Sequence, residues 1–168
     1  MTASLQPTIL RRQTIPSRRI LALPHPEPDP LDGYDLDAQV GFLLRRAHQR
    51  HTALFADGMA AADLTPMQFS ALVRIVALGR VTQNHLGRLV ATDPATIHGV
   101  VRRLEGRGLV ARLPDPGDRR TTVLAPTAAG LAMAAQAVPA ARAITAATLA
   151  PLRPDERRQL LSLLRKVA

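Results

Sequence analysis

The sequence predicts a mostly α-helical fold with one small β-hairpin, and three observations support this α+β class. From Asp35 onward, apolar residues recur at steps of three and four, which is the period of amphipathic helices. This period gives way at residues 109–124, where two short strand-like runs flank a segment dense in turn-forming residues. The chain has 168 residues, of which 46% are hydrophobic, so one domain with a core is expected.

Residues 1–33 are expected to form a flexible tail rich in proline and arginine. Helix is excluded there by an alternation of four prolines, Pro24, Pro26, Pro28 and Pro30. The folded domain is therefore expected to cover residues 34–168. Its first helix is predicted at about residues 35–57, from an apolar stripe made of Leu36, Val40, Leu43, Leu44, Ala47, Leu54 and Phe55.

The next three helices are marked by capping residues. Thr65 is followed by a proline and by Gln68, the pattern of an N-cap with a capping box, and Gly79 is expected to end this helix. Thr82 and Asp93 are the expected N-caps of a short third helix and of a fourth helix. The link between these two helices is short enough for a helix-turn-helix.

A β-hairpin is predicted directly after the fourth helix. Residues 109–113 and 121–124 form the two strand-like runs, and residues 114–118 form a charged turn rich in Pro, Gly and Asp. A hairpin in this position is a wing. The predicted architecture is a winged helix-turn-helix with further helices on both sides.

Two helices follow the hairpin. Thr127 is the expected N-cap of an alanine-rich helix, in which Pro139 predicts a kink or a break. Pro154 opens the last helix, whose apolar stripe consists of Leu160, Leu161, Leu163, Leu164 and Val167.

The charge of the chain predicts an anionic partner. Lys and Arg number 22 against 13 Asp and Glu, a formal net charge of +9, and nucleic acid is the first candidate. One Tyr, three Phe and no Trp are too few aromatic residues for the base-stacking surface of a single-strand binder, so double-stranded DNA is favoured. The absence of cysteine excludes disulfides and cysteine-ligated metals, and no apolar run is long enough to cross a membrane. We expect a cytoplasmic protein.

The fourth helix is the candidate recognition helix, because the second helix of a helix-turn-helix enters the major groove. Its outward residues could approach base edges or phosphates: Ala95, Thr96, His98, Gly99, Arg102 and Arg103. The third helix adds three candidate DNA contacts, Thr82, Gln83 and Arg88. At the wing, Arg119 and Arg120 could reach a narrow minor groove. An ordinary solvated basic face is the alternative for all of these residues.

Three motifs of this sequence resemble those of a known family. The run Asp118-Arg119-Arg120, with Leu124, Thr127 and Gly130, resembles the wing signature of the MarR family of bacterial transcription regulators. Residues 95–110 resemble the recognition helix of that family, and residues 64–69 resemble the start of its second helix. Residues 154–166 are similar to its C-terminal dimerisation helix. One departure is that Ala125 and Pro126 separate Leu124 from Thr127, where the family usually has Leu followed directly by Thr.

The resemblance implies a homodimeric repressor that binds a pseudo-palindromic operator. It implies a DNA-binding lobe at about residues 64–126 and dimerisation helices at about 35–57 and 127–168.

The resemblance also assigns roles at the wing. Asp93 would pair with Arg120 at the base of the wing, and together with Asp118 this pair would lock the wing to the recognition helix. Arg119 would then be the arginine that enters the minor groove.

The family resemblance further implies a small organic acid, often aromatic, as the effector that releases the repressor. Candidate contacts on the first two helices are Arg46, His48, Arg50, His51, Phe55, Met67 and Arg74. Arg or His could hold a carboxylate, with Phe55 and Met67 as apolar walls. Residues 40–51 resemble the branch that controls nicotinate catabolism, which implies a hydroxylated pyridine carboxylate. No cofactor is implied.

Several alternatives stay open. His48 and His51 are three residues apart, a spacing that a metal-responsive regulator could use. His51 and Phe55 could equally be core or dimer contacts, and Arg46 and Arg50 could be a solvated face. A ligand-independent architectural DNA-binding protein would share the basic surface. The chain has no glycine-rich phosphate loop, nucleophile elbow or paired carboxylates in an apolar setting, so an enzyme is not expected.

Overall fold

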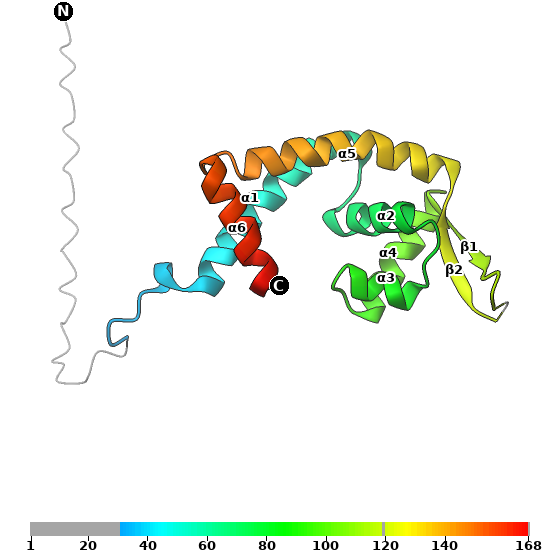
Figure 1. The fold of residues 1–168 in the computed structure, drawn as a ribbon, viewed down its shortest axis with the longest axis horizontal. Helices are drawn as coiled ribbons and strands as arrows, with labels where there is room; N and C mark the ends of the chain where they lie inside the picture. The colour runs from blue at the N-terminus through cyan, green and yellow to red at the C-terminus, as the bar shows by residue number, and fades with distance from the viewer. Residues whose placement is uncertain (1–30, 119, 168) are drawn as a thin grey trace, which may run out of the picture. The chain divides into compact units, whose positions relative to one another are not determined.

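The computed structural model describes residues 31–118 and 120–167 (Figure 1). The chain divides into a first unit, Met1–Asp35, and a second unit, Leu36–Ala168, and the second unit carries all of the helices and strands described below. The tail expected at residues 1–33 lies almost entirely outside the described residues. No helix in the described part is both long and apolar enough to cross a membrane.

The second unit confirms the predicted fold class, because six α-helices accompany one two-stranded hairpin in its described residues. Their order is η1 (Leu36–Ala38), α1 (Val40–Gly58), η2 (Ala60–Ala62), α2 (Pro66–Leu78), α3 (Gln83–Leu89), α4 (Pro94–Gly106), β1 (Val110–Pro114), β2 (Thr122–Pro126), α5 (Ala128–Thr148) and α6 (Pro154–Val167).

The predicted N-caps are confirmed. Thr65 accepts from the Gln68 N–H while the Gln68 side chain accepts from the Thr65 N–H, which completes the capping box of α2. Thr82, Asp93 and Thr127 cap α3, α4 and α5 in the same way, each accepting from a backbone N–H three residues later. These caps fix where each helix of the helix-turn-helix begins.

Two helices differ from the sequence prediction, and the start of the last one is as predicted. The first helix begins at Val40, because residues 36–38 form a separate 3-10 turn. Of the kink or break predicted at Pro139, the break is wrong, since α5 continues through this exposed proline as one helix of 21 residues. At the start of α6 no N-cap side chain is needed for the Arg153 N–H, because the Glu156 carboxylate accepts a hydrogen bond from it at 2.8 Å.

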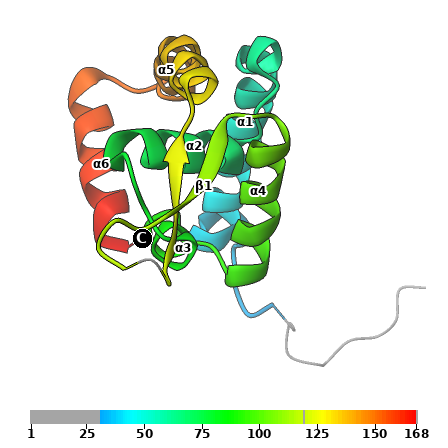
Figure 2. The same cartoon turned by 90° about the vertical axis from the view of Figure 1, so that its right-hand side faces the viewer.

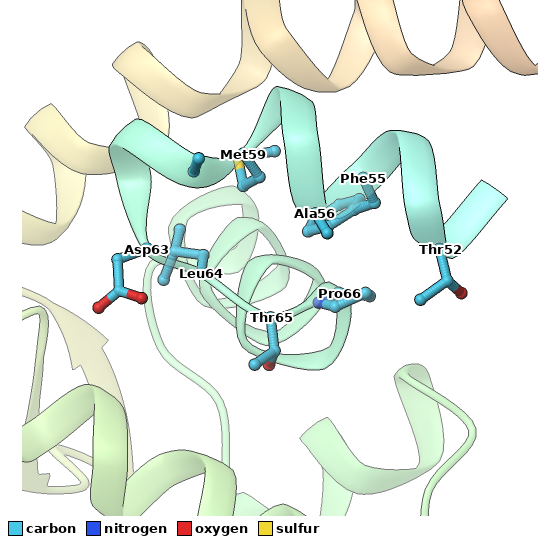
Figure 3. Close-up of a pocket in the computed structure, with 9 residues that line it drawn as sticks. Thr52, Phe55, Ala56, Met59, Asp63, Leu64, Thr65 and Pro66 are labelled. Atoms are coloured by element: carbon cyan, nitrogen blue, oxygen red, sulfur yellow. The ribbon is translucent and has the colours of Figure 1, made fainter. Parts of the chain in front are cut away.

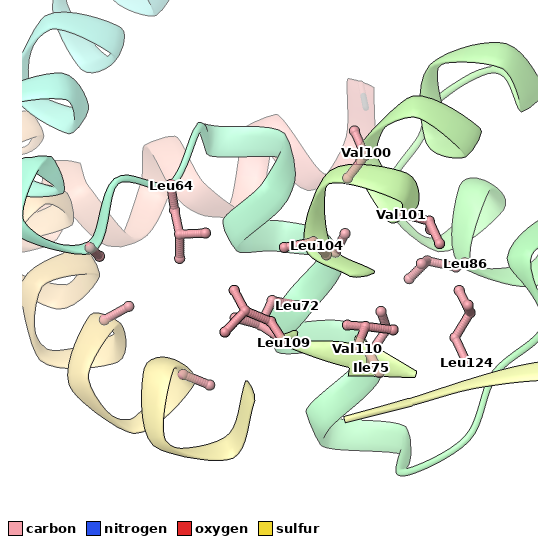
Figure 4. Packing of buried hydrophobic residues seen from close by; sticks show 14 of the residues in the cluster. Leu64, Leu72, Ile75, Leu86, Val100, Val101, Leu104, Leu109, Val110 and Leu124 are labelled. Atoms are coloured by element: carbon pink, nitrogen blue, oxygen red, sulfur yellow. The ribbon is translucent and has the colours of Figure 1, made fainter. Parts of the chain in front are cut away.

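One apolar core joins the helix-turn-helix, the wing base and part of α5 (Figure 4). Within this lobe its largest fully buried side chains come from three helices and one strand: Leu72 and Ile75 on α2, Leu86 on α3, Ile97, Val100, Val101 and Leu104 on α4, and Leu124 on β2. Burial on this scale is the main stabilising term for a domain of this size. It fixes the positions of α3, α4 and the wing.

The wing is a two-stranded antiparallel hairpin that lies beside α4 (Figure 2). Arg112 faces Leu124 in its register, and Leu124 also pairs with Val81 just before α3. Two hydrogen bonds make this bridge, from the Val81 N–H to the Leu124 carbonyl at 3.1 Å and from the Leu124 N–H to the Val81 carbonyl at 2.8 Å. The base of the wing is thereby attached to the helix-turn-helix.

Candidate nucleic-acid interface

The predicted recognition helix has one buried face and one exposed face. Ile97, Val100, Val101 and Leu104 are buried in the core. The candidate DNA contacts lie on the remaining surface: Ala95, Thr96, His98, Arg102 and Arg103 are exposed, and Gly99 is half-buried. The structure therefore brings these six candidates together on one helix, where their contact with DNA stays a prediction.

Asp93 serves the recognition helix itself. Its Oδ1 accepts from the Thr96 N–H at 2.9 Å. Hydrogen bonds from the Thr96 side chain and the Thr96 N–H hold the pKa of the Asp93 carboxyl below its ordinary value. The negative charge also suits the N-terminus of α4, where the helix dipole is positive.

The predicted lock between Asp93 and Arg120 is not formed. The ion pairs of residues 31–118 and 120–167 include none between these two side chains. One oxygen of the Asp93 carboxylate accepts the capping hydrogen bond, and Arg120 takes part instead in a local network at the wing tip.

Asp118 organises that wing tip. Its Oδ1 accepts from the Arg120 N–H at 3.0 Å, and its Oδ2 accepts from the Thr121 hydroxyl at 2.9 Å. Asp118 thus fixes the backbone at Arg120, whose side chain remains exposed. Arg119, the predicted minor-groove residue, lies outside the described residues.

The three candidates on α3 divide into two groups. Thr82 uses its hydroxyl to cap α3, accepting from the His85 N–H at 3.3 Å, and the Gln83 side-chain oxygen accepts from Arg112 at 2.9 Å. Arg88 is exposed and lines a cavity of about 270 Å³ between α3 and the start of α4. Contact of Arg88 with DNA stays a prediction.

Two arginines missed by the sequence analysis hold the lobe together. The guanidinium of Arg107, just after α4, donates to the Ala62 carbonyl at 3.0 Å and to the Asp63 carbonyl. Arg112 on β1 forms an ion pair with Glu105 at 2.9 Å as well as the bond to Gln83. The partners of Arg107 lie more than forty residues away in the chain, so no local sequence pattern reveals them.

Most effector candidates on α1 already have partners in the chain. Arg46 pairs with Asp37 at 3.4 Å, and Arg50 donates to the Ala147 carbonyl at 3.3 Å. His48 is within 3.5 Å of the Thr52 hydroxyl. No group of three His, Asp or Glu side chains suited to a metal occurs within the described residues.

His51 and Phe55 line a cavity between α1, α2 and α5. This cavity of about 170 Å³ also includes Phe69 and Ser70 of α2. The Nδ1 atom of His51 lies 3.0 Å from the Thr148 hydroxyl, which orients the imidazole. Phe55 and Phe69 meet edge to face, with ring centroids 6.0 Å apart.

A second cavity adjoins the first along α2. It measures about 450 Å³, shares Phe69 and Ser70 with the first cavity, and includes Arg74 and the turn residue Ala91. The structure therefore places His51, Phe55 and Arg74 along two neighbouring hollows. Met67 is half-buried against the core and lines neither of them.

Another cavity lies where α1 meets the start of α2 (Figure 3). It measures about 260 Å³ and is walled by apolar side chains that include Phe55, Met59 and Leu64. Its only charged lining residue is Asp63, and it contains no Arg, Lys or His. This composition disfavours a carboxylate ligand, because two negative charges would meet in an apolar setting.

Comparison with known proteins links this geometry to bacterial regulators. The sequence profile of the MarR family matches residues 64–122. The chain is 42% identical to the HTH-type transcriptional repressor NicR of Pseudomonas putida over 144 residues, which is 84% of this chain and 91% of NicR.

Solved structures agree with these sequence matches. A probable transcriptional regulator from Pseudomonas aeruginosa has a TM-score of 0.77 and 47% identity, covering 80% of this chain and 100% of that one. BpsR of Bordetella bronchiseptica, whose DNA binding is regulated by 6-hydroxynicotinic acid, has a TM-score of 0.76 and 40% identity, covering 80% and 96%.

Proposed function

The chain belongs to the MarR family, and we propose that it is a homodimeric repressor that binds a pseudo-palindromic operator and is released by a small aromatic carboxylate. Members of this family are transcriptional regulators and not enzymes. The operator, the dimer and the effector are the proposed parts.

DNA binding is supported chiefly by the exposed face of α4. Small residues at Ala95 and Gly99 let the helix backbone approach base edges, and Arg102 and Arg103 supply donors along the same helix. Neither arginine is part of an ion pair among residues 31–118 and 120–167, so both guanidinium groups are available.

The operator interface is tested with a duplex from the promoter of the chain's own gene. Arg102→Ala is expected to weaken specific binding by about 10- to 100-fold, measured by fluorescence anisotropy at fixed salt. Arg142→Ala on α5 is the matched control, since it removes an equally exposed arginine far from α4 in the sequence. Equal losses in the two variants would mean that α4 does not read the operator.

The homodimer is supported by the apolar faces that the chain leaves uncovered. No residue of α6 is buried, and exposed apolar residues also occur along η1 and the first half of α1. These are Leu36, Val40, Leu43 and Leu44 on one side and Leu160, Leu161, Leu163 and Val167 on the other. Burying such stripes against a second copy removes apolar surface from water.

The effector is supported by the two adjoining cavities along α2. His51 at one end and Arg74 at the other can bind a carboxylate, and Phe55 and Phe69 can contact an aromatic ring. The cavity in Figure 3 lacks a cation, so it is a poorer candidate for an acid. The ligand of BpsR, 6-hydroxynicotinic acid, has the chemistry that these side chains fit.

The effector is tested by titrating 6-hydroxynicotinic acid into the protein by calorimetry and into the operator complex by anisotropy. Arg74→Met and His51→Gln change residues at opposite ends of the two cavities. The variant at the end that binds the carboxylate is expected to weaken binding by at least about tenfold, because it removes a charge-assisted hydrogen bond, and the other variant by a smaller factor. Arg80→Met is the matched control, an exposed arginine that lines none of these cavities. If nicotinic, benzoic and 6-hydroxynicotinic acids all leave the complex intact, the proposed effector class is wrong.

A further inference from the structure

We propose that Arg112 is a positioning residue that fixes the direction of the wing relative to the recognition helix. It is not expected to touch DNA. The inference rests on the proposed function, because it matters only if α4 and the wing bind the same duplex.

Arg112 joins three elements through a single guanidinium group. It lies on β1, its Nε is 2.9 Å from the Glu105 carboxylate on α4, and its Nη2 donates to the Gln83 side-chain oxygen on α3 at 2.9 Å. Both acceptors use neighbouring nitrogens of one planar group. A lysine ammonium is a single point charge and would not span them in the same way.

The position of Arg112 in the hairpin lets a small change at this contact cause a larger movement of the wing tip. Arg112 is the cross-strand partner of Leu124, and Leu124 carries the bridge to Val81. Both attachments of the wing therefore lie at one level of the hairpin, one on each strand. Two further residue pairs and the turn extend beyond this level, so the tip lies on the order of 10 Å past it. A small rotation at the attachment is enlarged at the tip.

Arg112 also neutralises an unfavourable negative charge in the last turn of α4. Glu105 is the only acid within α4 and lies in its last turn, where the helix dipole disfavours a negative charge. It also shares this helix with the proposed phosphate- and base-binding arginines. The ion pair with Arg112 is half-buried, with side chains 37% and 27% exposed, so solvent screens it less than a fully exposed pair.

The test separates positioning from general charge attraction. Arg112→Met removes a positive charge and the contact, whereas Glu105→Met removes a negative charge and the same contact. General attraction predicts opposite changes in operator affinity, because Glu105→Met makes the protein more positive. Loss of wing positioning predicts that both variants weaken binding, by about tenfold for Arg112→Met and about threefold for Glu105→Met.

The readouts are operator affinity, hydroxyl-radical protection of the minor groove, and thermal unfolding. We expect both variants to melt near the wild type and to lose protection at the outer minor-groove segments while the centre stays protected. The double variant Arg112→Glu with Glu105→Arg is expected to restore most of the operator affinity and most of the outer minor-groove protection. Arg142→Met on α5 is the matched control and should change neither.

Several results would overturn the proposal. One is that Arg112→Met leaves the outer minor-groove protection unchanged, and another is that Glu105→Met binds the operator more tightly. A uniform fall in protection across the whole footprint would also overturn it, as would a charge-swapped double variant that fails to restore binding. If Arg112→Met does not fold, Glu105→Met alone decides by the same criteria. A wild-type protein that leaves the outer minor grooves unprotected would instead refute the proposed wing contact with DNA.

Discussion

The winged lobe and the outer helices bury their apolar residues in different ways. In the lobe, from Leu64 to Pro126, each helix contributes side chains to a shared core, and eight of the largest fully buried side chains lie there. In α6 no residue is buried, and Leu163 is 50% exposed. The lobe is thus stabilised by buried contacts within itself and with Phe55 and Met59 of α1 and Ile144 of α5, whereas the apolar stripe of α6 is complete only against another surface. This difference matches the proposed division of labour, in which the lobe binds DNA and the outer helices pair subunits.

The largest predicted effect comes from disrupting the apolar stripe of α6 while leaving the lobe unchanged. Leu160→Lys with Leu163→Lys places two charges on the α6 stripe and should abolish the dimer. Operator affinity should fall by about 10²- to 10⁴-fold, because the two lobes then bind independently. The added positive charge would by itself strengthen binding to DNA, so a loss of affinity reports the loss of the dimer. Sedimentation and anisotropy measure the two effects.

Leu78→Lys is the matched control in the lobe. Leu78 is 50% exposed, as Leu163 is, and it also lies near the C-terminus of its helix. It should leave the protein dimeric. If both variants become monomeric, or neither does, exposed leucines do not distinguish the two regions as argued here.

The second-largest predicted effect tests the contact between α5 and the wing, where the two regions meet. Gly130 lies in the first turn of α5, and a Cβ there would overlap the Leu109 carbonyl oxygen at the entrance to the wing. That carbonyl also accepts from the Thr127 N–H at 3.1 Å, so it has little freedom to move. Gly130→Ala is expected to destabilise the fold by about 3 kcal/mol, as overpacking of a rigid contact does. Urea unfolding of the dimer at fixed protein concentration measures this change.

Gly106→Ala is the control for this joint. Gly106 ends α4, and a Cβ there would meet nothing within 4 Å. The substitution should leave stability unchanged or raise it by up to about 1 kcal/mol. A Gly130→Ala protein as stable as Gly106→Ala would show that α5 and the wing are not tightly joined.

The lobe was predictable from the sequence because its signals are local. The caps at Thr65, Thr82, Asp93 and Thr127 each act over three residues, so their letters and spacing suffice to place four helices. The continuous α5 was mispredicted at Pro139, because this proline lies on an exposed face of a helix whose other face packs on α1 and α2. Tertiary packing there outweighed the local propensity.

The wing attachments were not predictable, because they depend on distant partners. Asp93 and Arg120 have the right charges for a lock, yet Asp93 is taken by the cap of α4. The attachment that exists uses Arg112, whose acceptor Gln83 is 29 residues earlier in the chain. Several side chains compete for each carboxylate in a basic protein, and only the fold decides between them.

The smallest effect concerns the cap of α4, which belongs to the lobe alone. Hydrogen bonds to Thr96 lower the pKa of Asp93, so the charged cap stabilises the fold at neutral pH. This contribution is complete above the ordinary carboxyl pKa of about 4 and disappears as the pH falls through the lower folded value. Asp93→Asn keeps a capping side chain without the charge, so it should lower Tm by roughly 1–3 °C at pH 7 and by less below pH 3.

Thr82→Ala is the control for the pH dependence of this cap. Thr82 caps α3 through a hydroxyl that does not titrate in this range, so its loss should shift Tm by a similar amount at every pH. A difference between wild type and Asp93→Asn that stays constant at every acidic pH at which the protein remains folded would contradict a stabilising charge at Asp93. Since both caps lie within the lobe, neither variant should alter dimer dissociation, and a change there would mean that the lobe and the outer helices are not stabilised separately.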